Sequence, residues 1–136
     1  MAGGFREIEH VADRAIQVWA DTVDGLFEQA AAGMFALMAG DLSAMPASRE
    51  HAATLDAGDT ESALVDWLNE LLYWRETRRE LYCQFQVVWD GRTLRARFAG
   101  APGAPTQGVI KAATFHGLRV EQDVAGIWRA AIVFDT

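Results

Sequence analysis

Two segments of the sequence carry apolar residues at the spacing of an α-helix that is buried on one side. The first is predicted to run from a cap at Asp21 or Thr22 to a stop at Gly40. The second begins at a cap provided by Asp59 or Thr60 and continues to about residue 79. Because the apolar stripe of a helix must be buried against another element, these two helices require a second layer of structure.

The other patterned segments alternate apolar and polar residues, or are short and apolar, as strands are. Between two of them Asp90-Gly91 is a strong hairpin signal, whereas Gly100–Gly108 is predicted to be a loop. The predicted strands are Phe5–His10, Ala15–Ala20, His51–Leu55, Gln84–Trp89, Thr93–Phe98, Val109–Phe115, Leu118–Gln122 and Ile127–Phe134. This order of elements predicts an α+β fold in which two amphipathic helices pack on one face of a mostly antiparallel β-sheet.

The length and composition favour one compact unit. A chain of 136 residues, 51% of them hydrophobic, can bury a core, and with no repeat or linker it is predicted to be a single domain over residues 1–136. It has no signal-peptide pattern and no apolar run of roughly 20 residues, so we expect no association with a membrane. The single cysteine, Cys83, suits a reducing compartment, and we expect a cytoplasmic protein.

The net charge of the chain bears on what kind of molecule the protein can bind. A formal net charge of −7 argues against a protein that coats nucleic acid by itself, but it permits a basic protein partner or a bound cation. Lys111 is the single lysine among 12 Lys and Arg residues. Because ammonium and guanidinium groups differ in size, hydration and geometry, a lone lysine in an arginine-rich chain suggests a special role for Lys111.

The candidate functional residues are polar residues at the ends of predicted strands. No phosphate-binding glycine-rich loop, CxxC pair, HExxH or Gly-x-Ser-x-Gly motif occurs. Asp13, Asp135 and the carboxylate of Thr136 could supply the oxygen ligands that a hard divalent cation prefers. His10 could add a nitrogen ligand for Zn²⁺ or Mn²⁺. On spacing alone this signal is weak, because an Asp between strands usually shapes a turn and an Asp after a last strand is usually solvated.

Five segments, in order along the chain, resemble the archease family. Together they run from near residue 5 to residue 136, and their order is more specific than any one of them alone. The segments are His10-Val11-Ala12-Asp13, similar to the family's His-Thr-Ala-Asp signature; residues 26–35 and 64–73, similar to its two helices; residues 110–118, similar to its Lys-Ala-x-Thr-Tyr-His segment; and the acidic ending Val133-Phe134-Asp135-Thr136. Val11 and Phe115 depart from the family pattern, which has Thr and Tyr there.

The resemblance implies an archease-like fold and an accessory role. Archeases promote guanylylation of the RtcB-type RNA ligase and allow its multiple turnover in tRNA splicing or RNA repair. They carry a divalent metal site that corresponds here to Asp13, Asp135 and Thr136, with His10 a further candidate; Ca²⁺, Mg²⁺, Mn²⁺ and Zn²⁺ are not distinguished. The functional lysine of the family corresponds to Lys111. The expected partner is the ligase, with RNA contacted only indirectly, and we expect a monomer or a weak homo-oligomer.

Two other functions and several other residues remain open. One alternative is a small metal-dependent phosphoester hydrolase, although it lacks a third firm ligand and an obvious general base. The other is a chaperone-like modulator of RNA-modifying enzymes. His116 precedes Gly117 at a predicted turn and is a candidate either for packing of that turn or for partner contact. His51 is expected at the surface. Asp66 and Asn69 are expected in a buried polar contact or on a solvated face, with contact to the partner as the alternative.

Overall fold

A computed structural model describes residues 3–8 and 13–136 of the chain. This described part contains two helices and eight strands. In chain order they are β1 (Gly4–Ile8), β2 (Arg14–Ala20), α1 (Val23–Ala39), β3 (Arg49–Asp56), α2 (Thr60–Arg78), β4 (Glu80–Trp89), β5 (Thr93–Pro102), β6 (Ala112–Ala113), β7 (Glu121–Gln122) and β8 (Trp128–Asp135). The predicted strand at residues 5–10 ends at Ile8 in the structure, and residues 9 and 10 lie outside the described residues.

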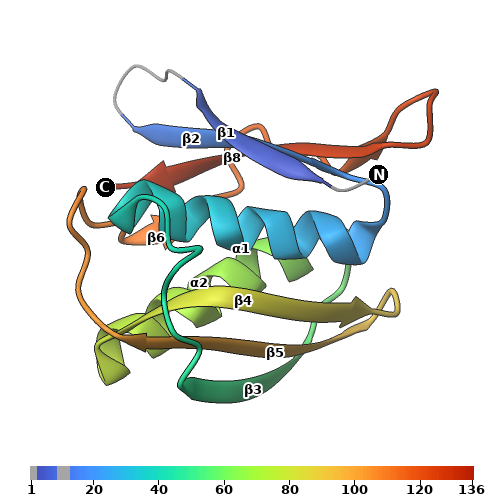
Figure 1. Ribbon diagram of the computed structural model, residues 1–136. Helices are drawn as coiled ribbons and strands as arrows, with labels where there is room; N and C mark the ends of the chain where they lie inside the picture. Colours follow the sequence, from blue (N-terminus) through green and yellow to red (C-terminus); the bar gives the residue numbers. More distant parts are fainter. Residues whose placement is uncertain (1–2, 9–12) are drawn as a thin grey trace.

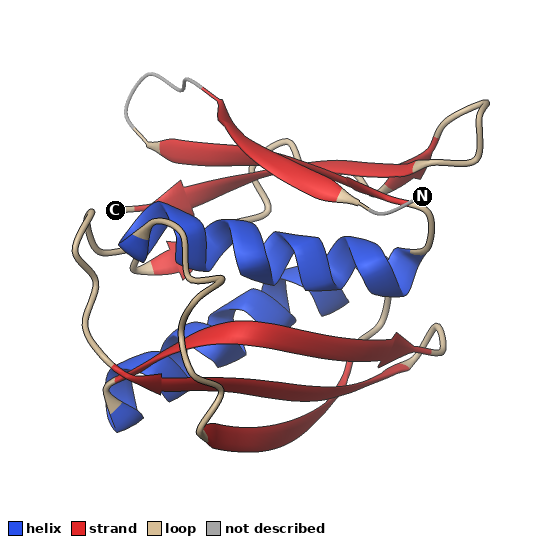
Figure 2. Cartoon of the chain, in the orientation of Figure 1, coloured by secondary structure: helices blue, strands red, loops and turns tan. Residues whose placement is uncertain are grey.

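The strands form two antiparallel sheets, and the helices lie between them (Figure 1, Figure 2). One sheet has the order β1-β2-β8-β6, with β7 also paired to β8, and the other has the order β3-β5-β4. The predicted α+β fold, with two helices packed on antiparallel strands, is confirmed. The strands divide into two sheets where one had been expected, because α1 is apolar enough to be covered from both sides.

Both helices begin and end at residues that the sequence had indicated. The side chain of Thr22 accepts a 3.0 Å hydrogen bond from the backbone N–H of Gly25, which caps α1. The carboxylate of Asp59 accepts a 2.7 Å bond from the N–H of Ser62 and caps α2 in the same way. Gly40 ends α1 with a φ of 76°, a backbone conformation that favours glycine.

Large apolar side chains fill the space between the two sheets. Trp67 of α2 is fully buried, and its indole N–H donates a 3.1 Å hydrogen bond to the backbone oxygen of Phe27 in α1. Each such buried side chain contributes about 1.5–3 kcal/mol by leaving water. The largest fully buried side chains are Trp67, Tyr82, Phe27, Phe35, Phe134, Ile16, Leu26, Met34, Met38, Leu64, Leu68 and Leu71. The core therefore joins both helices to both sheets.

Two carboxylates of α1 bind the outer edge of strand β4. Asp24 accepts a 2.8 Å hydrogen bond from the backbone N–H of Trp89, and Glu28 accepts a 2.9 Å bond from that of Val87. Burial raises the pKa of Glu28 above its ordinary value, although the bond from Val87 lowers it and the nearby charge of Asp24 raises it further. These contacts attach α1 to the three-stranded sheet and satisfy amides at an edge that would otherwise be open.

The predicted strands at residues 109–115 and 118–122 are reduced to the two-residue strands β6 and β7. Here side chains of α2 bind backbone groups that a neighbouring strand would otherwise bind. The carboxylate of Glu61 accepts a 2.9 Å hydrogen bond from the N–H of Val120, and the amide of Asn69 bonds the backbone of Ala113. The apolar alternation in this region thus reflects packing against α2, in addition to short pairing with β8.

Candidate functional site

The two candidate aspartates lie at the same end of two paired strands. In the β2–β8 ladder Arg14 pairs with Phe134, so Asp13 and Asp135 are the next residues along the two strands. Asp13 is in a bend directly before β2, and Asp135 is the exposed last residue of β8. The antiparallel register therefore places the backbones of two aspartates from opposite ends of the sequence side by side.

Lys111 lies beside Asp135 on the other side of β8. Its backbone N–H donates a 2.8 Å hydrogen bond to the backbone oxygen of Asp135, and the following residue, Ala112, pairs with Asp135 in the β6–β8 ladder. The side chain of Lys111 is exposed. The candidate residues Asp13, Asp135 and Lys111 thus come from the ends of three adjacent strands, β2, β8 and β6, at one edge of the five-stranded sheet, its acidic edge.

The other candidate residues are Thr136, His116 and His10, and the structure ties them less closely to the two aspartates. Thr136 follows Asp135 and is exposed. His116 is exposed in a tight turn, where its backbone N–H donates a 3.3 Å hydrogen bond to the hydroxyl of Thr114. The turn at Gly117 has a φ of 61°, so glycine is favoured there. His10 lies outside the described residues, and the structure neither brings it to the aspartates nor removes it from them.

Among the described residues, the candidate ligands at this edge offer oxygen atoms. Within residues 3–8 and 13–136, no group of three or more His, Cys, Asp and Glu side chains is arranged to hold a metal ion. Asp13 and Asp135 carry side-chain carboxylates, whereas the third expected donor, the carboxylate of Thr136, does not belong to a side chain of those four residue types. Carboxylate oxygens fit a hard cation such as Ca²⁺ or Mg²⁺, which also accepts water as a ligand, better than a soft one.

Asn69 makes a partly buried polar contact, one of the roles expected from the sequence, and holds the strand next to Lys111. Its side-chain oxygen accepts a 2.8 Å hydrogen bond from the N–H of Ala113, and its side-chain nitrogen donates a 3.2 Å bond to the oxygen of the same residue. No local sequence signal indicates this contact, because Asn69 and Ala113 are 44 residues apart in the chain.

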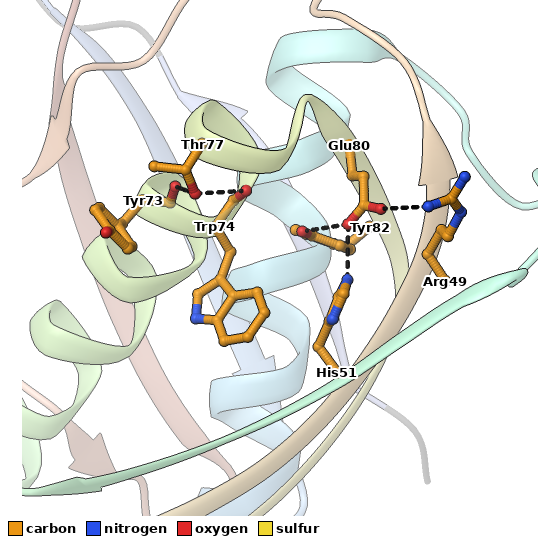
Figure 3. Close-up of polar contacts among 7 residues, drawn as sticks. All are labelled: Arg49, His51, Tyr73, Trp74, Thr77, Glu80 and Tyr82. Carbon is orange, nitrogen blue, oxygen red and sulfur yellow. Dashed lines mark hydrogen bonds and ion pairs between the residues drawn. The ribbon is translucent and has the colours of Figure 1, made fainter.

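A second polar cluster surrounds the buried carboxylate of Glu80 at the other sheet (Figure 3). One carboxylate oxygen lies 2.7 Å from Nε2 of His51 and accepts a 2.9 Å hydrogen bond from the hydroxyl of Tyr82. The guanidinium of Arg49 lies 3.9 Å from the other oxygen. Burial raises the pKa of Glu80, but the hydrogen bonds to His51 and Tyr82 and the charges of His51 and Arg49 together hold it below its ordinary value.

The prediction of His51 at the surface is wrong. Strand β3 turns this side chain toward the helices, where it is 16% exposed and its ring lies 4.7 Å from that of Trp74. Burial, followed by the hydrogen bond to Glu80, raises the pKa of Tyr82 well above its usual range. No buried side-chain nitrogen or oxygen in the described residues lacks a hydrogen-bond partner. We therefore interpret this cluster as structural, joining β3, β4 and α2.

In the described part of the chain no helix is both long enough and apolar enough to cross a membrane.

The fold and the candidate site define a class of α+β protein in which two helices lie between antiparallel sheets, with acidic residues and a lysine at one sheet edge. The profile of the Archease protein family (MTH1598/TM1083) matches residues 5–136. This chain belongs to the archease family.

Relatives and solved structures agree with this family. Protein archease of Methanopyrus kandleri is 34% identical over 139 residues, covering 96% of this chain and 98% of the relative. That of Methanosarcina mazei is 34% identical over 140 residues, covering 96% and 94%. The solution structure of Methanobacterium thermoautotrophicum protein 1598 superposes with a TM-score of 0.77 at 27% identity, covering 98% of this chain and 99% of that one.

The crystal structure of an archease from Thermotoga maritima, described as a "possible chaperone", has a TM-score of 0.68 at 22% identity and covers 96% of each chain. This likeness shows the fold alone.

Proposed function

We propose that this protein activates an RtcB-type RNA ligase, promoting guanylylation of the ligase and its multiple turnover in tRNA splicing or RNA repair. It acts as an accessory protein and catalyses no reaction by itself. The observation that carries the proposal is the hydrogen bond between the backbones of Lys111 and Asp135, which brings the lone lysine to the acidic edge of the sheet. Membership of the archease family supports an accessory role.

The proposal includes a divalent cation at the acidic edge. Asp13 and Asp135 would hold it through carboxylate oxygens, with the carboxylate of Thr136 as a third donor. His10 would add a nitrogen ligand if the ion were Zn²⁺ or Mn²⁺. A bound cation would supply positive charge at an edge that is otherwise acidic, and would so attract a phosphate or carboxylate of the partner complex.

Lys111 is the proposed contact residue for the partner. Its exposed ammonium is a compact point charge that can approach a phosphate or carboxylate of the ligase complex. Exposed His116 lies a few residues further along the same segment and is a second proposed contact. RNA is contacted only through the ligase, because a net charge of −7 disfavours direct binding to a polyanion.

The decisive experiment measures ligase guanylylation from GTP and the number of RNA-joining turnovers, with and without the purified protein. We expect faster guanylylation and repeated turnover when the protein is present, and no hydrolysis of phosphate esters by the protein alone. Metal-dependent hydrolysis in the absence of ligase would replace this proposal with that of a small phosphoester hydrolase. Absence of any effect on the ligase would contradict the activator role.

One observation favours a second candidate, a chaperone-like modulator of RNA-modifying enzymes. Val109 and Phe115 are each 56% exposed on either side of Lys111, and such apolar side chains can contact a partner protein without a metal. Stimulation of the ligase that persists in a chelator, and is lost on replacing Val109 and Phe115 with Ser, would favour this candidate over the metal-dependent activator.

A further inference from the structure

Strand β6 is short and lies at the edge of the five-stranded sheet. It contains Ala112 and Ala113, and among the strands of residues 3–8 and 13–136 it pairs with β8 alone. On the β8 side, the N–H of Lys111 bonds Asp135, and both the N–H and the hydroxyl of Thr114 bond the backbone oxygen of Val133. A strand this short gains little stability from a single neighbour, and its second edge would normally be open.

The second edge of β6 is instead occupied by one side chain of helix α2. The amide oxygen of Asn69 accepts from the N–H of Ala113 at 2.8 Å, and the amide nitrogen donates to the oxygen of Ala113 at 3.2 Å. A primary amide presents one acceptor and one donor side by side, as a peptide group does. Asn69 therefore takes the place of the next strand, with a rigid, capped helix behind it.

The neighbouring segments are attached elsewhere. The N–H groups of Thr106 and Gln107 bond the backbone oxygen of Met38 in α1, and that of Val120 bonds Glu61 in α2. Between these attachments the side-chain amide of Asn69 bonds the backbone of the segment at Ala113. The position of Lys111, two residues before Ala113, thus depends on β8 from one side and on Asn69 from the other.

We propose that Asn69 is a positioning residue for Lys111: its side-chain amide holds β6 against β8 and so keeps the ammonium of Lys111 at the acidic edge. The proposal rests on the proposed function, since it concerns the residue through which the protein acts on its partner. In this proposal Asn69 acts through the backbone and not by direct contact with a metal or the partner. Its effect passes through the backbone of Ala113 to the hydrogen bond between Lys111 and Asp135.

The chemistry distinguishes two substitutions of nearly equal size. Asn69→Leu removes both the donor and the acceptor. Asn69→Asp keeps an acceptor for the N–H of Ala113 but replaces the donor with an oxygen that repels the oxygen of Ala113. Asp66, exposed one turn earlier on α2, provides the matched control Asp66→Ala.

The first measurement is amide hydrogen exchange in the purified protein. In Asn69→Leu we expect the amides of Lys111, Ala113 and Thr114 to exchange roughly fivefold to tenfold faster, with the core of α2 and β8 unchanged. Asn69→Asp should have a smaller effect on Ala113, whose acceptor is retained, and Asp66→Ala should have none. Unchanged exchange of Lys111 and Thr114 in Asn69→Leu would overturn the proposal, because β8 alone would then hold β6.

The second measurement titrates each folded variant against the ligase. Displacement of Lys111 should lower the maximal stimulation of guanylylation by about tenfold in Asn69→Leu, and added protein should not restore it. Loss of folded protein alone would shift the half-maximal concentration and leave the maximum intact, which would contradict a positioning role. Full stimulation by Asn69→Leu, with none by Lys111→Ala, would overturn the proposal for Asn69 only. Full stimulation by both would instead remove Lys111 from the proposed function.

Discussion

The backbone N–H of Lys111 donates a 2.8 Å hydrogen bond to the backbone oxygen of Asp135. The lone lysine and the acidic end of β8 are therefore joined by a main-chain hydrogen bond that does not involve their side chains. A change that moves the end of β8 must move Lys111 with it. Substitutions of the two side chains can consequently be interpreted as changes of chemistry, with the backbone geometry retained.

Replacing Lys111 with Arg keeps the positive charge and changes its shape. We expect Lys111→Arg to reduce the stimulation of ligase guanylylation and Lys111→Ala to abolish it, because a planar guanidinium does not replace a compact ammonium. Arg119→Lys, the reverse exchange at a residue whose side chain is 81% exposed, is the matched control and should be fully active. Equal stimulation by all three variants would exclude Lys111 from the mechanism.

Neutral amides at the two aspartates should weaken cation binding and leave the fold intact. We expect Asp13→Asn and Asp135→Asn each to lower the affinity for Ca²⁺, Mg²⁺ or Mn²⁺ by at least about tenfold, measured by calorimetry, and to abolish ligase activation. Asp66→Asn removes an exposed carboxylate of the same charge and should bind the ion normally. Unchanged affinity in both aspartate variants would place the ion elsewhere or remove it from the proposal.

Glu80 should contribute stability that depends on pH. Because its pKa in the folded protein lies below its ordinary value of 4.5, folding favours the ionised form, so this contribution is present above about pH 4.5 and is lost as the pH falls through the folded pKa. At pH 7 we expect Glu80→Gln to lower the free energy of unfolding by about 2 kcal/mol. The difference from the wild type, measured by urea denaturation, should shrink on acidification to about pH 3.

An exposed glutamate provides the comparison for Glu80. Glu121, whose side chain is 65% exposed and lies 3.7 Å from Arg119, should change stability by less than about 1 kcal/mol when replaced by Gln. A difference between the wild type and Glu80→Gln that grows as the pH falls would contradict the pKa direction.

Two substitutions at Glu28 should have opposite consequences. Glu28→Gln retains an oxygen for the N–H of Val87 and removes a charge whose burial is unfavourable, so stability at pH 7 should stay equal or rise slightly. Glu28→Ala leaves that amide without its acceptor and should cost about 1–3 kcal/mol in thermal or urea unfolding. Glu76→Ala, at an exposed position of α2, controls for helix propensity. Equal destabilisation by Gln and Ala at residue 28 would mean that the charge itself is required.

The parts of the fold that were predictable from sequence are those decided within a few residues. At the β4–β5 hairpin the carboxylate of Asp90 accepts hydrogen bonds from the N–H groups of Arg92 and Thr93, and Gly91 has a φ of 94°. The helix caps follow the same rule. In each case the residue type and its partners are sequence neighbours, so the pattern alone indicates the structure.

Gly100 shows why the limits of the strands were harder to predict. It was assigned to a loop, but β5 continues through it to Pro102. A side chain at Gly100 would overlap the backbone oxygen of Leu81 in β4, so glycine is needed there for close approach of two strands. A glycine that permits close packing and a glycine that permits a turn are identical in the sequence, and only the tertiary contact separates them.

The candidate site also contains residues that were predictable from the sequence and one that was not. Asp13, Asp135 and Lys111 were indicated by the motifs around them and by the rarity of lysine, and the β2–β8 and β6–β8 pairings bring their backbones to one edge. Asn69 was not identified as part of this region, since its partner lies 44 residues away and an asparagine on a helix has no characteristic spacing to a strand. A contact between residues far apart in the chain produces no local sequence pattern that would predict it.

The pairing of β2 with β8 also determines when the candidate site can exist during synthesis. Residues 14–20 leave the ribosome more than 100 residues before their neighbour in the sheet, residues 128–135. Until then the apolar face of β2 and one side of α1 lack their final covering, and Asp13 has no Asp135 beside it. Any cation or partner that requires both aspartates can bind only after residue 135 has been made and paired, so shorter products of translation should be unable to compete for it.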